Sequence, residues 1–204
     1  MIVVQVNGTL VARTDVGGGR YVTLDVTDWV IVGSNGRLLS DGLGRTWGSG
    51  PGEGNAQGSG GGHGGRGGSQ GGGLLTSGQS AAHGSFRLPA TFGGGGGGSC
   101  GGSGGGIVNL KAGGLIKVDG VISVKGQDGG NGSCGGGAGG SIYIEAERIQ
   151  GGGYLFAHGG RGGSGKGEEE EEEEGSLWLL HTKHLLEQPS PLEEWEVKIN
   201  MIWF

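Results

Sequence analysis

A fifteen-residue phrase that contains one cysteine and a run of glycines occurs twice in this chain. It reads GSCGGSGGGIVNLKA at Gly98–Ala112 and GSCGGGAGGSIYIEA at Gly132–Ala146, so the copies lie 34 residues apart. In each copy the glycine run leads into a stretch in which apolar residues alternate with others, which is the period of a strand with one buried face. Units repeated at a fixed period of this order are typical of architectures whose copies stack on one another. We therefore expect stacked copies of one short β-unit.

A shorter pattern supports this expectation. A glycine followed by alternating aliphatic residues occurs four times, as GTLVA (Gly8–Ala12), GRLLSDG (Gly36–Gly42), GVISVKG (Gly120–Gly126) and GYLFAHG (Gly153–Gly159). We predict an all-β fold over residues 1–166, a single-stranded parallel β-solenoid (β-helix-like) with long glycine-rich loops. The side chains expected to face its core are Val4, Val6, Leu10, Ala12, Val30, Val32, Leu38, Val108, Leu110, Ile116, Val118, Ile122, Val124, Ile142, Ile144, Ile149, Leu155 and Ala157, and Val22, Leu24 and Val26 are expected to add a further strand.

Glycine supplies 58 of the 204 residues, against about 7% in an average protein. A collagen helix is excluded, because glycine does not fall at every third position and the chain has only four prolines. The phrase HGGRGGS occurs at His63–Ser69 and again at His158–Ser164. This repetition favours partly ordered excursions, such as packed polyproline II strands, over mobile loops, because glycine allows extended chains to approach closely.

The charge divides the chain into two regions. Residues 1–166 hold 12 Lys and Arg against 9 Asp and Glu, whereas residues 167–204 hold 2 Lys against 11 Glu, including the run Glu168–Glu174. We expect the first region to be the folded domain, and the second to be a disordered or marginal tail or an artefact of gene prediction. The basic surplus is too small for binding by phosphate neutralisation, so no nucleic acid partner is expected. No apolar stretch of about 20 residues indicates a membrane span, and no signal peptide is visible, so we interpret the chain as a fragment of a longer protein.

The two cysteines hold equivalent places in consecutive copies of the repeat. Stacked positions on neighbouring strands lie about 4.8 Å apart, inside the range of roughly 4.4–6.8 Å between Cα atoms that a disulfide requires. We predict a disulfide between Cys100 and Cys134, with two buried free thiols as the alternative. A disulfide would indicate an oxidising compartment and hence an extracellular or cell-surface location.

Four phrases together resemble a known class of proteins: GSGGGHGGRGG, HGSFRLPATFGGGGGGSCGGSGGGIVNL, LIKVDGVISVKGQDG and GGGAGGSIYIEAERIQGGGYLFAHGGRGG. Over about residues 30–166 the chain is similar to large eukaryotic glycine-rich proteins of parallel β-helix type, in which such a unit is repeated. The resemblance implies an extracellular or receptor-like parent chain and says little about activity.

The histidines and aspartates of the chain do not form a recognisable catalytic or metal-binding motif. His63 and His158 each begin HGGRGGS and are interpreted as turn-edge histidines. His181 and His184 lack the glutamate and third ligand of a zinc site. Asp25, Asp41, Asp119 and Asp128 are candidates for a carboxylate pair, but Asp41 aligns with Lys125 in the repeat, which argues mildly against such a pair. We assign no catalytic, cofactor-binding or metal-binding residues and expect no cofactor.

Three functions follow, in order of preference. The first is a non-catalytic structural or interaction module of an extracellular or cell-surface glycine-rich protein, with an unidentified protein or glycan partner. The second is a β-helix that binds or cleaves polysaccharide, which would need a carboxylate-lined groove. The third is an RNA binder of the RGG type, because Arg66 and Arg161 each stand in the sequence GGRGG. RGG segments, however, usually carry many arginines beside stacking aromatics.

Overall fold

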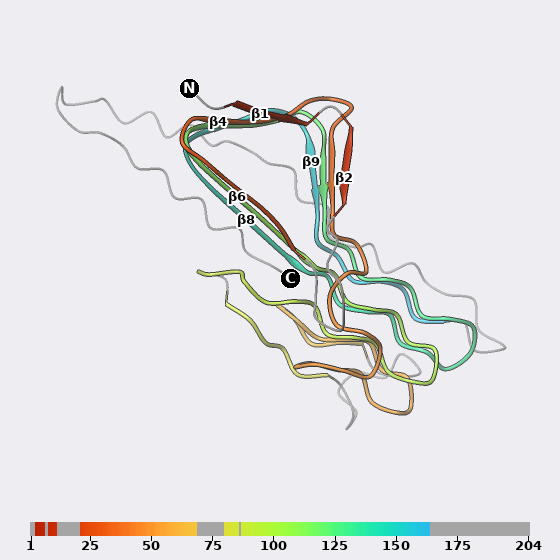
Figure 1. The fold of residues 1–204 in the computed structure, drawn as a ribbon. Helices are drawn as coiled ribbons and strands as arrows, with labels where there is room; N and C mark the ends of the chain where they lie inside the picture. The colour runs from red at the N-terminus through yellow and green to blue at the C-terminus, as the bar shows by residue number, and fades with distance from the viewer. Residues whose placement is uncertain (1–2, 7, 12–20, 69–79, 86, 164–204) are drawn as a thin grey trace.

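The computed structural model describes residues 3–6, 8–11, 21–68, 80–85 and 87–163. Within these ranges the chain forms nine strands and no helix (Figure 1). The strands are β1 (Val3–Val6), β2 (Thr9–Val11), β3 (Tyr21–Val26), β4 (Trp29–Val32), β5 (Arg37–Leu39), β6 (Ile107–Val118), β7 (Val121–Ser123), β8 (Ser141–Gln150) and β9 (Tyr154–Phe156).

The strands belong to two sheets in which all pairs are parallel. The first sheet has the order β1-β4-β6-β3, with β8 also paired to β6, and the second has the order β2-β5-β7-β9. The long strand β6 pairs with β3 along its first half and with β4 along its second half, and β8 follows both halves. The register between β6 and β8 shifts between Ala112 and Leu115, where Gly113 and Gly114 interrupt the alternation of apolar residues.

The core lies between the two sheets and is built from aliphatic side chains in register. In the second sheet Leu10, Leu38, Ile122 and Leu155 are aligned across all four strands. Leu38 and Ile122, on the inner strands, are fully buried, and the core contains most of the side chains predicted to face it. The buried members are Val22, Val30, Val32, Leu38, Val108, Leu110, Ala112, Ile116, Val118, Ile122, Val124, Ile142, Ile144, Ala146 and Leu155.

Leu10 is an exception, because 40% of its side chain is exposed. It lies on β2, which is an edge strand of the second sheet and has a neighbour on one side only. The side chains of Val4 and Val6, and the whole of Ala12, are not among the parts of the chain that the structure describes. The predicted tail, 167–204, with His181 and His184, also falls outside them.

The predicted β-solenoid with glycine-rich loops is wrong. The described strands form two separate sheets of parallel strands and no closed solenoid. The glycine-rich segments are not loops that return to the next strand, because they leave the sheets and hydrogen-bond to one another through their backbones. In Figure 1 they lie together beneath the strands. We call this part the glycine bundle and define it as residues 44–68, 80–85, 87–106, 124–140 and 157–163.

Hydrogen bonds in the glycine bundle recur at every third residue. In segment 134–141 the N–H groups of Gly135 and Ala138 donate to the carbonyls of Gly97 and Gly94, respectively. A period of three is that of the polyproline II helix, which makes no hydrogen bonds within its own chain. We therefore describe the bundle as packed chains of the polyproline II type. The same spacing relates further pairs of donors, including Gly137 and Gly140, Gly94 and Gly97, Gly93 and Gly96, and Gly102 and Gly105.

The bundle extends in three dimensions, unlike a sheet. Segment 134–141 is hydrogen-bonded to five other segments, whereas a strand in a sheet has at most two neighbours. This packing requires glycine at the contacts: a Cβ atom on Gly136, for example, would overlap the carbonyl group of Gly160. The segments that bond to 134–141 are 59–62, 94–97, 102–106, 124–127 and 160–163.

Candidate functional site

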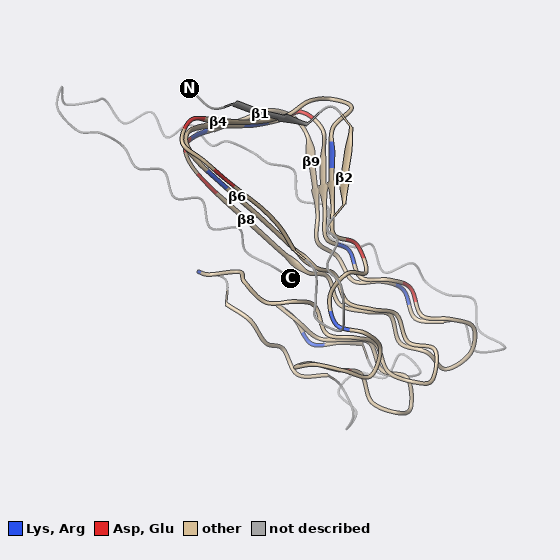
Figure 2. Ribbon diagram, viewed as in Figure 1, with Lys and Arg blue, Asp and Glu red and all other residues tan. Residues whose placement is uncertain are grey.

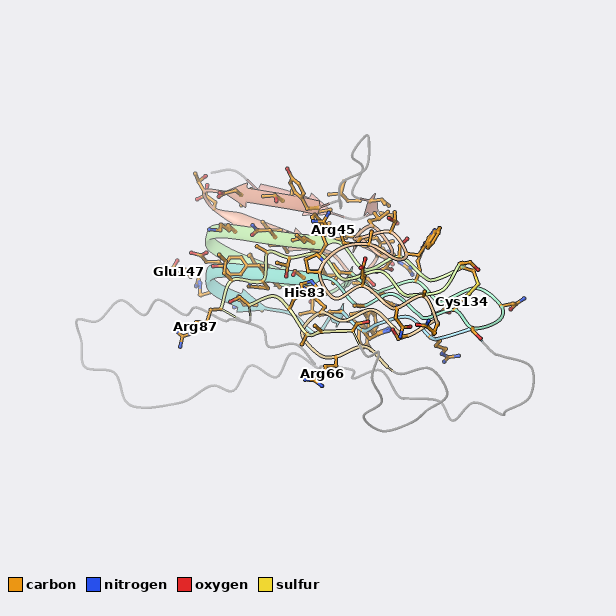
Figure 3. The ribbon with its side chains drawn as sticks, turned by 90° about the horizontal axis from the view of Figure 1, so that it is seen from below. Arg45, Arg66, His83, Arg87, Cys134 and Glu147 are labelled. Atoms are coloured by element: carbon orange, nitrogen blue, oxygen red, sulfur yellow. A yellow bond between two sulfur atoms is a disulfide. The ribbon has the colours of Figure 1, made fainter. Side chains whose placement is uncertain are left out.

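Cys100 and Cys134 lie side by side at turns of the glycine bundle. Their Cα atoms are 5.4 Å apart across a sequence separation of 34 residues, and their sulfur atoms are at disulfide distance. The two chains are also joined beside the pair, because the Gly130 N–H donates to the Cys100 carbonyl at 2.8 Å. Figure 3 shows Cys134 at the opposite end of the described structure from Glu147 of β8. The arrangement therefore fits a covalent link across two adjacent turns.

Two histidines from different segments meet inside the bundle. The ring centroids of His63 and His83 are 4.9 Å apart. His63 Nε2 lies 2.7 Å from Thr91 Oγ1, and His83 Nε2 lies 3.2 Å from the Phe92 carbonyl oxygen. Figure 3 shows His83 among the stacked chains. The pair thus attaches segment 80–85 to the segment that follows it.

The position of His63 changes its acid–base behaviour. Its side chain is buried, with 5% of its surface exposed. Burial, and to a smaller extent the neighbouring His83, lowers the pKa of His63 from 6.5 to about 4. The interpretation of His63 as a turn-edge histidine is therefore wrong, and this ring is neutral at physiological pH.

The second copy of HGGRGGS lies in a different environment. His158 follows β9 at the surface of the bundle, and its ring contacts Phe156 edge-on at a centroid distance of 6.3 Å. Arg161 donates its backbone N–H to the Asp128 carboxylate at 2.8 Å. The same sequence therefore contains a buried histidine in one copy and a surface histidine in the other. Arg66 in the first copy is exposed (Figure 3).

The four candidate aspartates are not brought together as a carboxylate pair in the described part of the chain. Asp41 accepts hydrogen bonds from Ser123 Oγ at 2.5 Å and from the Lys125 N–H at 2.7 Å. Asp119 forms an ion pair with Lys117 at 2.8 Å. The lysine also lowers the pKa of the Asp119 carboxyl, chiefly through their hydrogen bond. The remaining two have other neighbours: Asp25 is aligned with Lys111, and Asp128 bonds to Arg161.

The outer face of the first sheet carries a row of alternating charges. Asp25, Lys111 and Glu145 are aligned on β3, β6 and β8, and Lys111 Nζ lies 3.2 Å from a Glu145 oxygen. Tyr143 donates its hydroxyl to the same carboxylate at 2.6 Å, which raises the pKa of the phenol. Figure 2 shows acidic and basic residues side by side on β6 and β8, while the bundle is mostly uncharged. Exposed cross-strand pairs of this kind contribute about 0.2–1 kcal/mol each, so they favour correct register.

The second sheet ends in a row of rings along β9. Tyr154 and Phe156 are two residues apart, their rings are nearly parallel (3°), and their centroids are 6.1 Å apart. The Lys125 ammonium lies 4.7 Å from the Phe156 centroid, within cation–π range. We call Tyr154, Phe156 and His158, together with Lys125, the aromatic row. Tyr154 is 49% exposed, so its ring offers an apolar surface next to the Phe156 ring that Lys125 contacts.

Sequence reasoning missed two of these features. The first is the contact between His63 and His83. His83 belongs to no recognisable motif, and the contact depends on how the chain folds through the glycine bundle, which the local sequence does not reveal. The aromatic row could have been found, because rings at every second residue of a strand lie on one face.

Comparison with known protein families, with curated proteins and with solved structures finds no match to this chain. In the described part of the chain, no helix is long and apolar enough to cross a membrane. Nor do the described residues contain a group of three or more His, Cys, Asp or Glu side chains suited to hold a metal ion.

Proposed function

We propose that this chain is a non-catalytic structural or interaction module of an extracellular or cell-surface glycine-rich protein. The observation that carries the proposal is the Cys100–Cys134 pair, which lies at disulfide distance across two turns of the bundle. Disulfides persist in oxidising compartments and are rare in the cytosol. A bridge that closes a loop of this length stabilises the fold by about 3–4 kcal/mol on the chain-entropy model.

The polar groups on the described surface support a role without catalysis. Asp41, Asp119 and Asp128 are engaged with separate partners. Glu145 raises the pKa of the Tyr143 phenol, which favours its protonated form. The sheets and the bundle form a backbone-bonded scaffold whose outer faces are available to a protein or glycan partner.

The test is a non-reducing peptide map of the full chain, secreted from a eukaryotic host behind an added leader. The chain is denatured, its free thiols are alkylated, and it is cut with trypsin. Cleavage at Lys111, Lys117 and Lys125 separates Cys100 from Cys134 unless a disulfide joins them. We expect one linked peptide that separates on reduction. Secreted, folded chain with both cysteines alkylated would contradict the proposal, as would a chain that is retained in the cell.

Glycan binding is a second candidate, and the aromatic row favours it. Ring faces stack on the C–H faces of sugars, and the hydrogen-bonding and charged groups of Lys125 and His158 adjoin the rings. An exposed row of rings on a strand suits an extended polysaccharide better than a small ligand, since small ligands prefer concave sites.

We predict that Tyr154→Ala weakens retention of the chain on immobilised polysaccharide about tenfold, because it removes the most exposed ring of the row and its stacking energy. The measurement is affinity electrophoresis through gels that contain neutral or acidic polysaccharides. Tyr21→Ala is the matched control, because Tyr21 is also exposed (57%) but lies on β3 of the other sheet. Equal retention of the two variants and the parent chain would rule out the aromatic row as a glycan site.

A further inference from the structure

A modification motif lies beside the second cysteine. Asn131, Gly132 and Ser133 form the sequence N-x-S, which is the acceptor for N-linked glycosylation in chains that enter the secretory pathway. Most acceptor motifs that are used lie in surface segments, because the transferase must reach the carboxamide. The position of this turn in the fold therefore decides whether the motif can be used.

The acceptor side chains of the turn are exposed, while its backbone carbonyls pack against Gly58, Gly98 and Gly163. Asn131 and Ser133 are both exposed, and within the described structure the Asn131 carboxamide makes no hydrogen bond. Gly132 has a φ of +100°, and a Cβ atom built on it would meet no atom within 4 Å. The turn connects segments 124–130 and 134–140 of the bundle and projects away from the strands (Figure 1).

The backbone on both sides of the turn is nevertheless fixed. The Gly130 N–H donates a hydrogen bond to the Cys100 carbonyl, and the Cys134 N–H donates to the Gly132 carbonyl, each at 2.8 Å. The side chain of Asn131 is therefore presented from an anchored turn. Because the Asn131 side chain is exposed, a bulky group on it would extend outward from the described part of the chain.

We propose that Asn131 carries an N-linked oligosaccharide. The donor is a lipid-pyrophosphate-linked oligosaccharide of the secretory pathway. The Asn131 Nδ2 atom forms a bond to C1 of the first sugar, the bond from C1 to the pyrophosphate oxygen breaks, and the lipid pyrophosphate leaves. The amide gives up one proton to a basic group of the transferase. This inference rests on the proposed extracellular or cell-surface function, because the donor and the transferase act only on chains that enter the secretory pathway.

The glycan would stand at the end of the bundle beside the cysteine pair. The charged residues Asp25, Lys111 and Glu145 lie on strands of the first sheet, and Tyr154 and Phe156 lie on β9, so none of them belongs to this turn. A partner could therefore bind these strands while the glycan shields the turn.

The experiment uses the full chain secreted from a eukaryotic host behind an added leader. The secreted chain is treated with peptide N-glycosidase, which releases the glycan and converts the modified asparagine to aspartate. We expect a mobility shift on treatment, and conversion at Asn131 on peptide mapping. Asn131→Gln and Ser133→Ala should abolish conversion in this peptide, whereas Ser133→Thr should retain it.

Asn35→Gln is the matched control. Asn35 is an exposed asparagine that is also followed by glycine, but Arg37 stands where the motif needs a hydroxyl, so this substitution should leave the shift unchanged. A second motif, Asn7-Gly8-Thr9, begins outside the described residues and is distinguished because it falls in a different peptide.

Two failures have different meanings. Secreted chain with linked cysteines and unmodified Asn131 would overturn the glycosylation inference and leave the proposed function standing. A chain that is retained in the cell with free thiols would overturn the proposed function, and the inference with it.

Discussion

At the scale of single residues, His63 and its neighbours show how the bundle encloses a titratable group. The ring is buried against His83 and lies beside Thr91. Burial, and to a smaller extent His83, disfavours the protonated form of this ring. A proton on His63 would therefore be unfavourable in the folded state.

We predict that the free energy of unfolding falls as the pH is lowered from about 6.5 to about 4. In this window the unfolded chain binds a proton at His63 and the folded chain does not, because burial lowers the pKa of the folded group to about 4. The loss attributable to this residue is up to about 3 kcal/mol and is complete below that pKa. Urea unfolding at a series of pH values measures it.

Two variants isolate the contribution of this ring. His63→Gln should flatten the dependence on pH in the same window, whatever its effect on overall stability. His158→Gln, at the surface copy of the same phrase, should preserve the slope. An unchanged slope in His63→Gln would contradict the assignment.

At the scale of segments, the strands were largely predictable, whereas the choice of neighbours among the glycine runs was not. Alternation places Leu38 and Ile122 in the core, as expected. The strand period cannot reveal which glycine segments become neighbours, because a run of glycines carries no side-chain pattern. Two identical HGGRGGS phrases consequently have different surroundings. The proximity of Cys100 and Cys134 was predicted from repeat spacing, and the disulfide itself stays a prediction.

We predict that Gly136→Ala destabilises the fold by about 1–3 kcal/mol, since the added Cβ would overlap the Gly160 backbone and force the chains apart. Gly162→Ala is the control in the same bundle, because a Cβ there would have only one ordinary contact, at 3.7 Å from the Cys134 carbonyl oxygen. Its effect should stay within about 0.5 kcal/mol. Thermal unfolding of the two variants provides the comparison, and equal melting temperatures would contradict close packing at Gly136.

At the scale of the whole molecule, the structure joins two kinds of order. The sheets are held together by the burial of a cluster of aliphatic side chains. The glycine bundle is held together by hydrogen bonds between backbone groups. The predicted solenoid was wrong because it placed the glycine runs as excursions between the coils of one continuous solenoid. The backbone N–H and C=O groups of different glycine runs instead hydrogen-bond to one another. To reach these partners, the chain departs from the regular coils of a solenoid.

The hydrogen-bond period of three has a consequence for how such a chain changes in length. Three residues make one turn of a polyproline II helix. Adding or removing three glycines in each of two adjoining segments therefore shifts both by one turn, and each backbone N–H again faces a carbonyl of the neighbouring segment. Adding one or two would rotate the donors away from their acceptors. Related chains should therefore differ in bundle length by multiples of three residues, while the strands keep their lengths.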